Sequence, residues 1–281
     1  MPATKTLIVI GGATATGKTA HAIRLAQDLG TEVLSADSRQ FYREMSIGTA
    51  KPSPEELAAV KHHFIDTLSV AEDYSVGDFE RDALRVLGEI FQKNDHAVLV
   101  GGSGLYLKAV CEGLDVFPEI SVATRQQVAE GEQTGGLAWL QTELRRLDPA
   151  YFEAVDQNNP ARLRRALEVC LESGQPYSAF TQNAKKPRPF AIENRLLTMP
   201  RPELYARIEA RVDAMLVAGL EAEARSLLPH RHRPALRTVG YEEFFDYFDG
   251  LIGHAEAVSK IKQHSRNYAK RQDTWFRKYF V

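Results

Sequence analysis

An eight-residue segment near the N-terminus has the spacing of a phosphate-binding loop. It reads GATATGKT, fits GxxxxGK[ST], and lies between an apolar strand pattern and a helical pattern. Its glycines let backbone N–H groups turn toward phosphate oxygens, and the N-terminus of the following helix adds positive potential. Lys18 adds a positive charge, and the Thr19 hydroxyl is a ligand for Mg²⁺. The segment predicts a site for a phosphorylated small molecule and Mg²⁺, formed by Gly12, Ala13, Thr14, Ala15, Thr16, Gly17, Lys18 and Thr19.

A carboxylate follows the second predicted strand. P-loop ATPases usually carry an Asp after a later strand to help hold Mg²⁺, but here the apolar strand 97–100 leads into Gly101, Gly102 and Ser103. Asp37, in SADSRQ, lies where the carboxyl ends of parallel strands place their ligands. We therefore expect Asp37 to face the phosphates, either holding metal-bound water or acting as a general base on an acceptor. An Asx turn at the end of the strand is the alternative.

Strands and helices alternate through the first part of the chain. Apolar or β-branched runs predict short strands at 6–10, 32–35, 64–65, 97–100 and 195–199. Helical patterns separate them, and SVGD at Ser75 matches a capping box. This order predicts an α/β fold, with a P-loop NTPase-like parallel sheet flanked by helices.

The strand pattern stops near residue 115. Polar sequence with helical spacing replaces it up to residue 158, and Asn159 and Pro160 then begin another helix. We predict three parts: residues 1–114 as the first part of the α/β core, 115–158 as a small helical insertion, and 159–281 as the completion of the core with a basic, helical C-terminus.

Composition limits the class of protein. The 281 residues have globular proportions and a net charge of −2, and the N-terminal apolar run is far shorter than the roughly 20 residues that cross a bilayer. Cys111 and Cys170 lack CxxC spacing, which argues against a disulfide framework or a thiolate zinc site. We expect a cytoplasmic protein with no membrane partner, acting as a monomer.

The charge is unevenly distributed. Between residues 258 and 281 the only acidic residue is Asp273, and the basic residues are Lys260, Lys262, Arg266, Lys270, Arg271, Arg277 and Lys278. A basic helix with interleaved aromatic residues suits a nucleic-acid backbone groove with stacking platforms. Aromatic residues at helical spacing are also typical of a core, and this is the alternative for Trp275 and Phe276.

Seven segments in order resemble the signature blocks of one enzyme family, the tRNA dimethylallyltransferases. They are GATATGKT, SADSRQFYREMSIGTAKPS, HHFIDTLSVAEDYSVGDFERDA, VLVGGSGLYLKAVCEGL, NNPARLRRALEV, RTVGYEEFFDYFDG and YAKRQDTWFRK. They are distributed over nearly the whole chain outside the insertion, from residue 12 to residue 278. Only the first is diagnostic alone, whereas seven in register are hard to obtain by accident.

The resemblance implies prenyl transfer from dimethylallyl diphosphate to the exocyclic amine of the adenosine beside the anticodon of tRNA. Lys18, Thr19 and Mg²⁺ would then stabilise the leaving diphosphate, and Asp37 would accept the amine proton. Ser103 stands where the family usually has Thr, so the hydroxyl remains near the amine. Arg207 matches an Arg taken to bind diphosphate, with Arg211 one turn later. The alternative for Arg207 is an exposed helix face shared with Glu203.

The resemblance also implies positions that contact the tRNA anticodon stem-loop. They are Asp37, Ser38, Arg39, Gln40, Ser103, Arg125, Arg162, Arg165, Arg237, Lys270, Arg271 and Arg277.

Other functions fit parts of the sequence. A small-molecule kinase also pairs a P-loop with an Asp after the second strand, and a related transferase could act on free adenine nucleotides. An RNA-binding module in which the nucleotide only changes the protein's shape is the non-enzymatic alternative.

Overall fold

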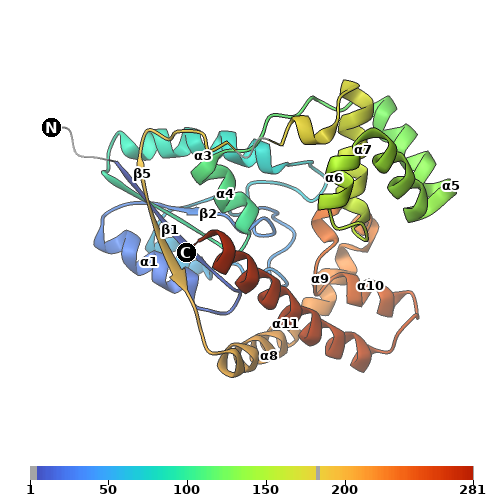
Figure 1. Cartoon of the computed structure of the whole chain (residues 1–281). Helices are drawn as coiled ribbons and strands as arrows, with labels where there is room; N and C mark the ends of the chain where they lie inside the picture. Colours follow the sequence, from blue (N-terminus) through green and yellow to red (C-terminus); the bar gives the residue numbers. More distant parts are fainter. Residues whose placement is uncertain (1–4, 182–183, 281) are drawn as a thin grey trace. The chain divides into compact units, whose positions relative to one another are not determined.

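The computed structural model describes residues 5–181 and 184–280. The chain forms two compact units, one made of Met1–Cys111 with Pro187–Val281 and the other of Glu112–Lys186. The order of elements can be followed in Figure 1. The two units are described one at a time.

The first unit is built on a five-stranded sheet in the order β3-β2-β4-β1-β5. All neighbouring strands are parallel, which confirms the predicted α/β class. The strands are β1 (Thr6–Gly12), β2 (Val33–Ser35), β3 (His62–His63), β4 (His96–Gly101) and β5 (Ala191–Leu197). β1 and β4 are almost entirely buried because both are continuous apolar runs. β5 is an edge strand and its first four residues are exposed.

The third strand lies just before the predicted one. The prediction placed it at 64–65, whereas the pairing with β2 uses His62 and His63. Phe64 has φ 63° and turns into the core instead of continuing the strand. The chain therefore leaves the sheet two residues earlier than its apolar pattern indicates.

Helices cover both faces of this sheet (Figure 1). On one face, α1 (Lys18–Asp28) packs through Ala22, Ile23 and Ala26 against alternate residues of β1, β2 and β4. On the other face, α3 (Val76–Phe91) and α4 (Gly104–Glu112) pack against the strand residues that point away from α1, such as Leu7, Val9 and Leu99. The predicted capping box at Ser75 is present at the start of α3. The short helix α2 (Pro54–Ala59) precedes β3.

The rest of this unit is helical. It comprises α8 (Arg201–Val217), α9 (Leu220–Ser226), α10 (Glu242–Phe248) and α11 (His254–Tyr279), with the 3₁₀ turns η2 (Leu228–His230) and η3 (Pro234–Leu236). Phe276 is only 1% exposed and belongs to the main core. The alternative given above for Phe276, a core aromatic residue, is therefore correct.

The second unit is a cluster of helices. It contains α5 (Val122–Leu147), α6 (Pro149–Ala154), α7 (Pro160–Ser173) and the 3₁₀ turn η1 (Tyr177–Ala179). α5 is kinked at Gly136, whose φ is 60°. Its Leu140 and Leu144 share a core with Leu163 and Leu167 of α7.

This packing moves the boundary of the helical insertion. The predicted insertion ends at residue 158, which leaves α7 in the core, whereas the compact helical unit extends to Lys186. The physical reason is the apolar face of α7, which is buried in a core shared with α5 and α6.

None of the helices in the described residues has both the length and the apolar composition that a membrane span requires.

Candidate functional site

The phosphate-binding loop connects β1 to α1 in the first unit. Gly12 has φ 149°, and a Cβ there would lie 2.4 Å from the carbonyl oxygen of Leu197, so the tight turn requires glycine. Gly17 has φ 86° and precedes α1, which has no side-chain cap at its N-terminus. The first N–H groups of α1 are therefore available to an anion.

A cavity of about 350 Å³ lies against this loop. Its wall includes Lys18 and Thr19 from the loop, Asp37 from the exit of β2, Gly102 from the exit of β4 and Arg211 from α8. Lys18 donates a hydrogen bond from Nζ to the carbonyl oxygen of Ala13 at 2.7 Å. The cavity thus joins the exits of two strands to the loop, as expected for an open parallel sheet.

Burial changes the charge balance of this cavity. It lowers the pKa of Lys18 to about 8; the negative charge of Asp37 opposes this shift, and Arg211 adds to it. Burial also raises the pKa of Asp37, while the Arg39 N–H and the nearby cations oppose that shift. Perturbed groups of both signs in one cavity are typical of a functional site.

The Asp37 carboxylate is oriented by its own turn. Its Oδ1 accepts a hydrogen bond from the backbone N–H of Arg39 at 3.1 Å. This is the Asx turn given as the alternative above, but the carboxylate also lines the cavity beside Lys18. The turn and the chemical role are therefore compatible.

Arg211 rather than Arg207 reaches the loop. The Arg211 Nη1 donates to the Thr14 hydroxyl at 3.3 Å, and burial, followed by the charge of Arg207, lowers the pKa of Arg211. Arg207 is exposed, and its Nη1 lies 3.9 Å from the sulfur of Met199. The residue predicted to contact diphosphate was Arg207, whereas the residue that lines the cavity is Arg211, one turn later.

Ser103 connects the exits of β4 and β2. Its Oγ accepts a hydrogen bond from the Ser38 N–H at 3.2 Å and lies 3.3 Å from the Ser38 hydroxyl. Tyr268 of α11 also bonds to Ser103, and burial, with a further contribution from Asp37, raises the pKa of this phenol to about 12. Two predicted residues, Ser38 and Ser103, thus lie together, and Tyr268 joins them from the last helix.

The side chains of Arg39 and Gln40 form hydrogen bonds with backbone carbonyl groups of the first unit. The Arg39 guanidinium donates to the carbonyl oxygens of Pro234 at 3.1 Å and Arg237 at 3.3 Å. The Gln40 Nε2 donates to the carbonyl oxygens of Thr49 and Ala50, each at 3.2 Å. Both side chains therefore hold the walls of the site together.

A second cavity, of about 110 Å³, adjoins the first. Thr14, Asp37, Thr49, Ala50 and Arg211 line both cavities. The second is mainly apolar, and its apolar residues are Ile208, Val212, Met215, Leu220, Val239 and Ile261. An ionic group and an apolar group of one small molecule can therefore lie on the two sides of Asp37.

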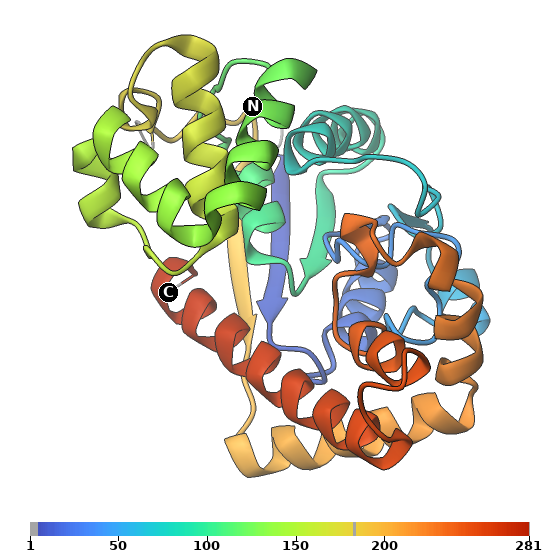
Figure 2. The same cartoon turned by 90° about the vertical axis from the view of Figure 1, so that its right-hand side faces the viewer.

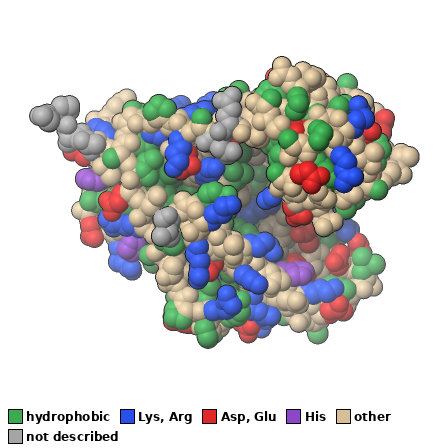
Figure 3. Space-filling model, viewed as in Figure 1, with side chains coloured by type: hydrophobic (Ala, Val, Ile, Leu, Met, Phe, Trp, Pro, Cys, Tyr) green, Lys and Arg blue, Asp and Glu red, His purple; other side chains and the backbone are tan. Residues whose placement is uncertain are grey.

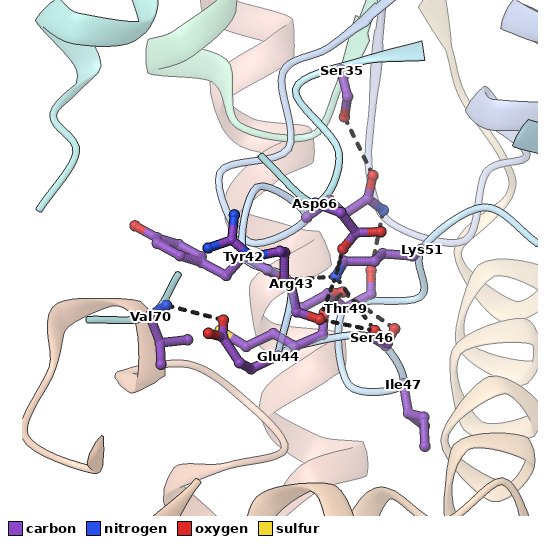
Figure 4. Close-up of polar contacts among 12 residues, drawn as sticks. Ser35, Tyr42, Arg43, Glu44, Ser46, Ile47, Thr49, Lys51, Asp66 and Val70 are labelled. Carbon is purple, nitrogen blue, oxygen red and sulfur yellow. Dashed lines mark hydrogen bonds and ion pairs between the residues drawn. The ribbon is translucent and has the colours of Figure 1, made fainter. Parts of the chain in front are cut away.

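The loop 42–51 forms part of both walls and is held by polar contacts (Figure 4). Lys51 donates to the carbonyl oxygen of Tyr42 at 2.6 Å and pairs with Asp66. In the same view, Glu44 accepts a hydrogen bond from the Val70 N–H at 3.0 Å. These bonds fix a loop that has little regular structure of its own.

Glu223 of α9 holds the tip of this loop from the other side. Its carboxylate accepts hydrogen bonds from the N–H groups of Ser46, Ile47 and Gly48 at 2.9, 2.8 and 2.9 Å. It also accepts one from the Tyr241 hydroxyl at 2.7 Å. Nothing in the sequence alone singled out Glu223, because the three backbone N–H groups that it binds lie about 175 residues earlier in the chain.

The predicted RNA-contacting residues lie in both units. In the first unit, Arg237, Lys270, Arg271 and Arg277 are exposed, and Lys and Arg side chains gather on the face over α8 and α11 (Figure 3). Arg277 pairs with Asp273 at 2.9 Å. In the helical unit, Arg125, Arg162 and Arg165 are exposed, and Arg165 also lies 5.6 Å from the centre of the Phe117 ring.

The oxygen atoms of Thr19 and Asp37 are suited to Mg²⁺ that is also bound by substrate, and they are too few to hold a metal by themselves. Among the described residues, no group of three or more His, Cys, Asp or Glu side chains could hold a metal ion. Thr19 and Asp37 line the phosphate cavity together. Mg²⁺ is commonly held by one or two protein oxygens with substrate phosphates and water, so this donor set suits it.

The fold and site define a class: an α/β P-loop protein whose phosphate cavity adjoins an apolar one. The IPP transferase family model matches residues 40–279, and the chain belongs to this family.

Curated relatives agree with this membership. A tRNA dimethylallyltransferase of Christiangramia forsetii is 50% identical over 272 residues, which are 97% of this chain and 90% of that protein. One of Cytophaga hutchinsonii is 46% identical over 98% of this chain and 90% of its own length.

Solved structures of tRNA prenyl transferases are similar to this chain. The full-length tRNA isopentenylpyrophosphate transferase of Bacillus halodurans has a TM-score of 0.71 and 38% identity, covering 97% of this chain and 87% of that one. A eukaryotic dimethylallyltransferase acting on tRNA has a TM-score of 0.82 at 24% identity, covering 97% and 70%, and so supports the fold.

We predict that Glu223→Gln lowers the free energy of unfolding by about 1.5–3 kcal/mol, because it removes a charged acceptor shared by four donors. Urea unfolding followed by circular dichroism measures this change. The control is Glu256→Gln, which breaks an exposed i,i+4 pair with Lys260 and should cost less than about 1 kcal/mol. Equal effects of the two substitutions would contradict the role of Glu223 in holding the loop 42–51.

Proposed function

We propose that this chain transfers the dimethylallyl group of dimethylallyl diphosphate to the exocyclic amine of the adenosine next to the anticodon of tRNA, releasing diphosphate. The observation that carries the proposal is the pair of adjoining cavities, one built for phosphate and one apolar, with Asp37 and Arg211 in the wall of both. Membership of the IPP transferase family supports it. The proposal places the enzyme in the cytoplasm, where it acts as a monomer.

The phosphate cavity would hold the leaving group. The N–H groups of the P-loop, Lys18 and Arg211 surround the position where negative charge grows as the C–O bond breaks. Fixed charges and dipoles aimed at developing charge supply a large part of many rate enhancements. Mg²⁺, held by Thr19 and substrate oxygens, would neutralise further charge there.

The apolar cavity would hold the five-carbon group. A diphosphate in the P-loop would place its ester carbon towards Asp37, which lines both cavities, and Ile208, Val212 and Met215 would provide an apolar wall beyond it. This wall excludes water from an allylic carbon that water would otherwise attack.

Asp37 would act on the acceptor amine. The amine nitrogen forms a bond to the allylic carbon, the C–O bond breaks with its electrons on diphosphate, and the amine proton passes to the Asp37 carboxylate. The aryl amine is a weak nucleophile because its lone pair is conjugated with the ring, so a base within hydrogen-bond reach is required. Ser103 and Tyr268 provide hydroxyl groups on the same side of the site.

The adenosine must leave its stack to reach this site. Base extrusion costs a few kcal/mol, which protein stacking and phosphate contacts offset. Lys270 and Arg271 are exposed on α11, two and three residues after Tyr268. The basic face of α11 would therefore hold the RNA backbone next to the extruded base.

The decisive experiment uses mass spectrometry of RNA. The protein is incubated with Mg²⁺, dimethylallyl diphosphate and an anticodon stem-loop that carries the adenosine, and we expect a five-carbon mass increase on that nucleotide. AMP replaces the stem-loop in a parallel reaction, and ATP replaces the donor in another. Product on AMP alone would support the free-nucleotide transferase, phosphate transfer from ATP would support the kinase, and RNA binding without product would support the non-enzymatic module.

Asp37→Asn should lower turnover by about 10²–10⁴-fold, the usual contribution of a general base. Asn keeps the acceptor for the Arg39 N–H, so the turn survives and pyrophosphate affinity should change little. Single-turnover rates and calorimetric binding of pyrophosphate measure the two effects. Asp213→Asn on α8, which breaks a surface pair with Lys262 of α11, is the control. Turnover within threefold of the wild type would remove Asp37 from the chemistry.

The pH dependence of kcat/KM should be bell-shaped. Asp37 must be ionised to accept a proton, and burial raises its pKa, so the rate rises with pH above the ordinary range of Asp. Lys18 must be charged to bind diphosphate, and its pKa of about 8 makes the rate fall as pH rises through that value.

The same profile distinguishes free from bound protein. A bound diphosphate favours charged Lys18, so the falling limb of kcat should lie at higher pH than that of kcat/KM. Asp37→Asn should abolish the rising limb and keep the falling one. Identical profiles for the variant and the wild type would show that another group titrates.

The basic face of α11 should control the salt dependence of RNA binding. Replacing Lys270 and Arg271 together with Ala removes up to two phosphate contacts, and the slope of log affinity against log salt should decrease in magnitude by about 1 to 2. Fluorescence anisotropy with a labelled stem-loop at several salt concentrations measures the slope. Replacing the exposed Arg24 and Lys93 with Ala is the control and should leave it unchanged. An unaltered slope in the α11 variant would exclude this face from the interface.

A further inference from the structure

One buried amide on α11 bridges the P-loop and the end of β4. Gln272 is 6% exposed. Its Oε1 accepts a hydrogen bond from the Thr14 N–H at 2.8 Å, and its Nε2 donates to the carbonyl oxygen of Gly102 at 2.9 Å. One side chain thus satisfies two backbone groups of opposite kind, at the third residue of the P-loop and at the exit of β4.

Helix α11 contacts this part of the sheet without an intervening layer of side chains. A Cβ at Gly102 would lie 2.3 Å from the Gln272 Nε2. Cβ atoms at Gly11 and Gly104 would lie 2.5 Å from the Phe276 ring and 2.4 Å from the Trp275 ring. The helix crosses the end of the sheet at which β1 ends (Figure 2). Its position relative to the P-loop is therefore set by direct contact with backbone.

The chemistry of the bridge requires an amide. Thr14 needs an acceptor and Gly102 needs a donor, and Gln supplies both from one rigid planar group. Leaving two buried backbone groups without partners costs about 1–3 kcal/mol each. The bridge keeps the Thr14 segment in the position in which the loop presents its other N–H groups to phosphate.

We propose that Gln272 is a positioning residue for diphosphate binding, which holds the P-loop against the exit of β4 in its binding conformation. The inference rests on the proposed function only in taking diphosphate as the ligand of the loop. Gln272 does not touch the reacting atoms in this role. Its effect is on the affinity of the loop for diphosphate, because a preorganised loop loses less conformational entropy when the ligand binds.

Two substitutions separate this role from ordinary packing. Gln272→Met keeps the length of the side chain and removes both hydrogen bonds. Gln272→Glu introduces a carboxyl group that, when protonated, donates to Gly102 and accepts from Thr14 as the amide does. When ionised, the same group repels the Gly102 oxygen and a nearby diphosphate. Burial raises the pKa of such a carboxyl group above the ordinary 4.3 or so, so its ionisation falls within an accessible range of pH.

The measurement is calorimetric binding of pyrophosphate in Mg²⁺ to the full chain, without RNA and without a prenyl donor. Gln272→Met should bind pyrophosphate roughly 5- to 100-fold more weakly than the wild type. Gln272→Glu should bind nearly as tightly as the wild type at low pH and progressively more weakly as pH rises. Gln263→Glu, at an exposed position of the same helix, is the control and should follow the wild type at every pH.

The outcomes decide the inference separately from the proposed function. A folded Gln272→Met variant with affinity within twofold of the wild type would overturn it, as would a Gln272→Glu variant whose affinity relative to the wild type is the same at every pH. Pyrophosphate binding with the expected variant effects, but without prenyl transfer to RNA, would support the positioning role and contradict the proposed reaction. No binding by the wild-type protein would overturn both.

Discussion

The hydrogen bonding of backbone N–H groups at the turn between β1 and α1 is the interaction on which this structure depends. These groups bind an anion only if the turn holds its shape without a ligand, and the turn begins on a strand buried between β4 and β5. Gly12 permits the close approach to Leu197 that this geometry needs. The sheet, helix α1 and helix α11 together hold the backbone N–H groups of this turn in position.

The charges around this turn explain why neither Lys18 nor Asp37 can be considered alone. Each is unfavourable in a buried position, and each opposes the pKa shift of the other. Arg211 adds positive charge that an incoming diphosphate balances. The cavity therefore carries the charge that a multiply charged anion would balance, and in the proposed reaction Asp37 acts as a base next to a leaving diphosphate.

The sequence was most informative where the structure is local. A P-loop is a continuous segment, so its spacing predicts its geometry, and Asp37 follows from the rule that strand ends meet at one edge of a parallel sheet. Arg207 and Arg211 lie on the same face of one helix, and only the placement of α8 decides which guanidinium reaches Thr14. α7 has the periodicity of any amphipathic helix, which cannot say which unit buries it. The sequence does not indicate the contacts of Gln272 and Glu223, because the backbone groups that they bind lie far away in the chain.

The contact between Gln272 and Thr14 also has a consequence for the order of events during synthesis. The two residues are 258 positions apart, so the P-loop emerges from the ribosome long before the helix that completes it. Gly11 of β1, and Gly102 and Gly104 after β4, remain uncovered until α11 packs onto them. A nascent chain therefore carries its P-loop early, but the hydrogen bond from the Thr14 N–H to Gln272 forms only after α11 has been synthesised.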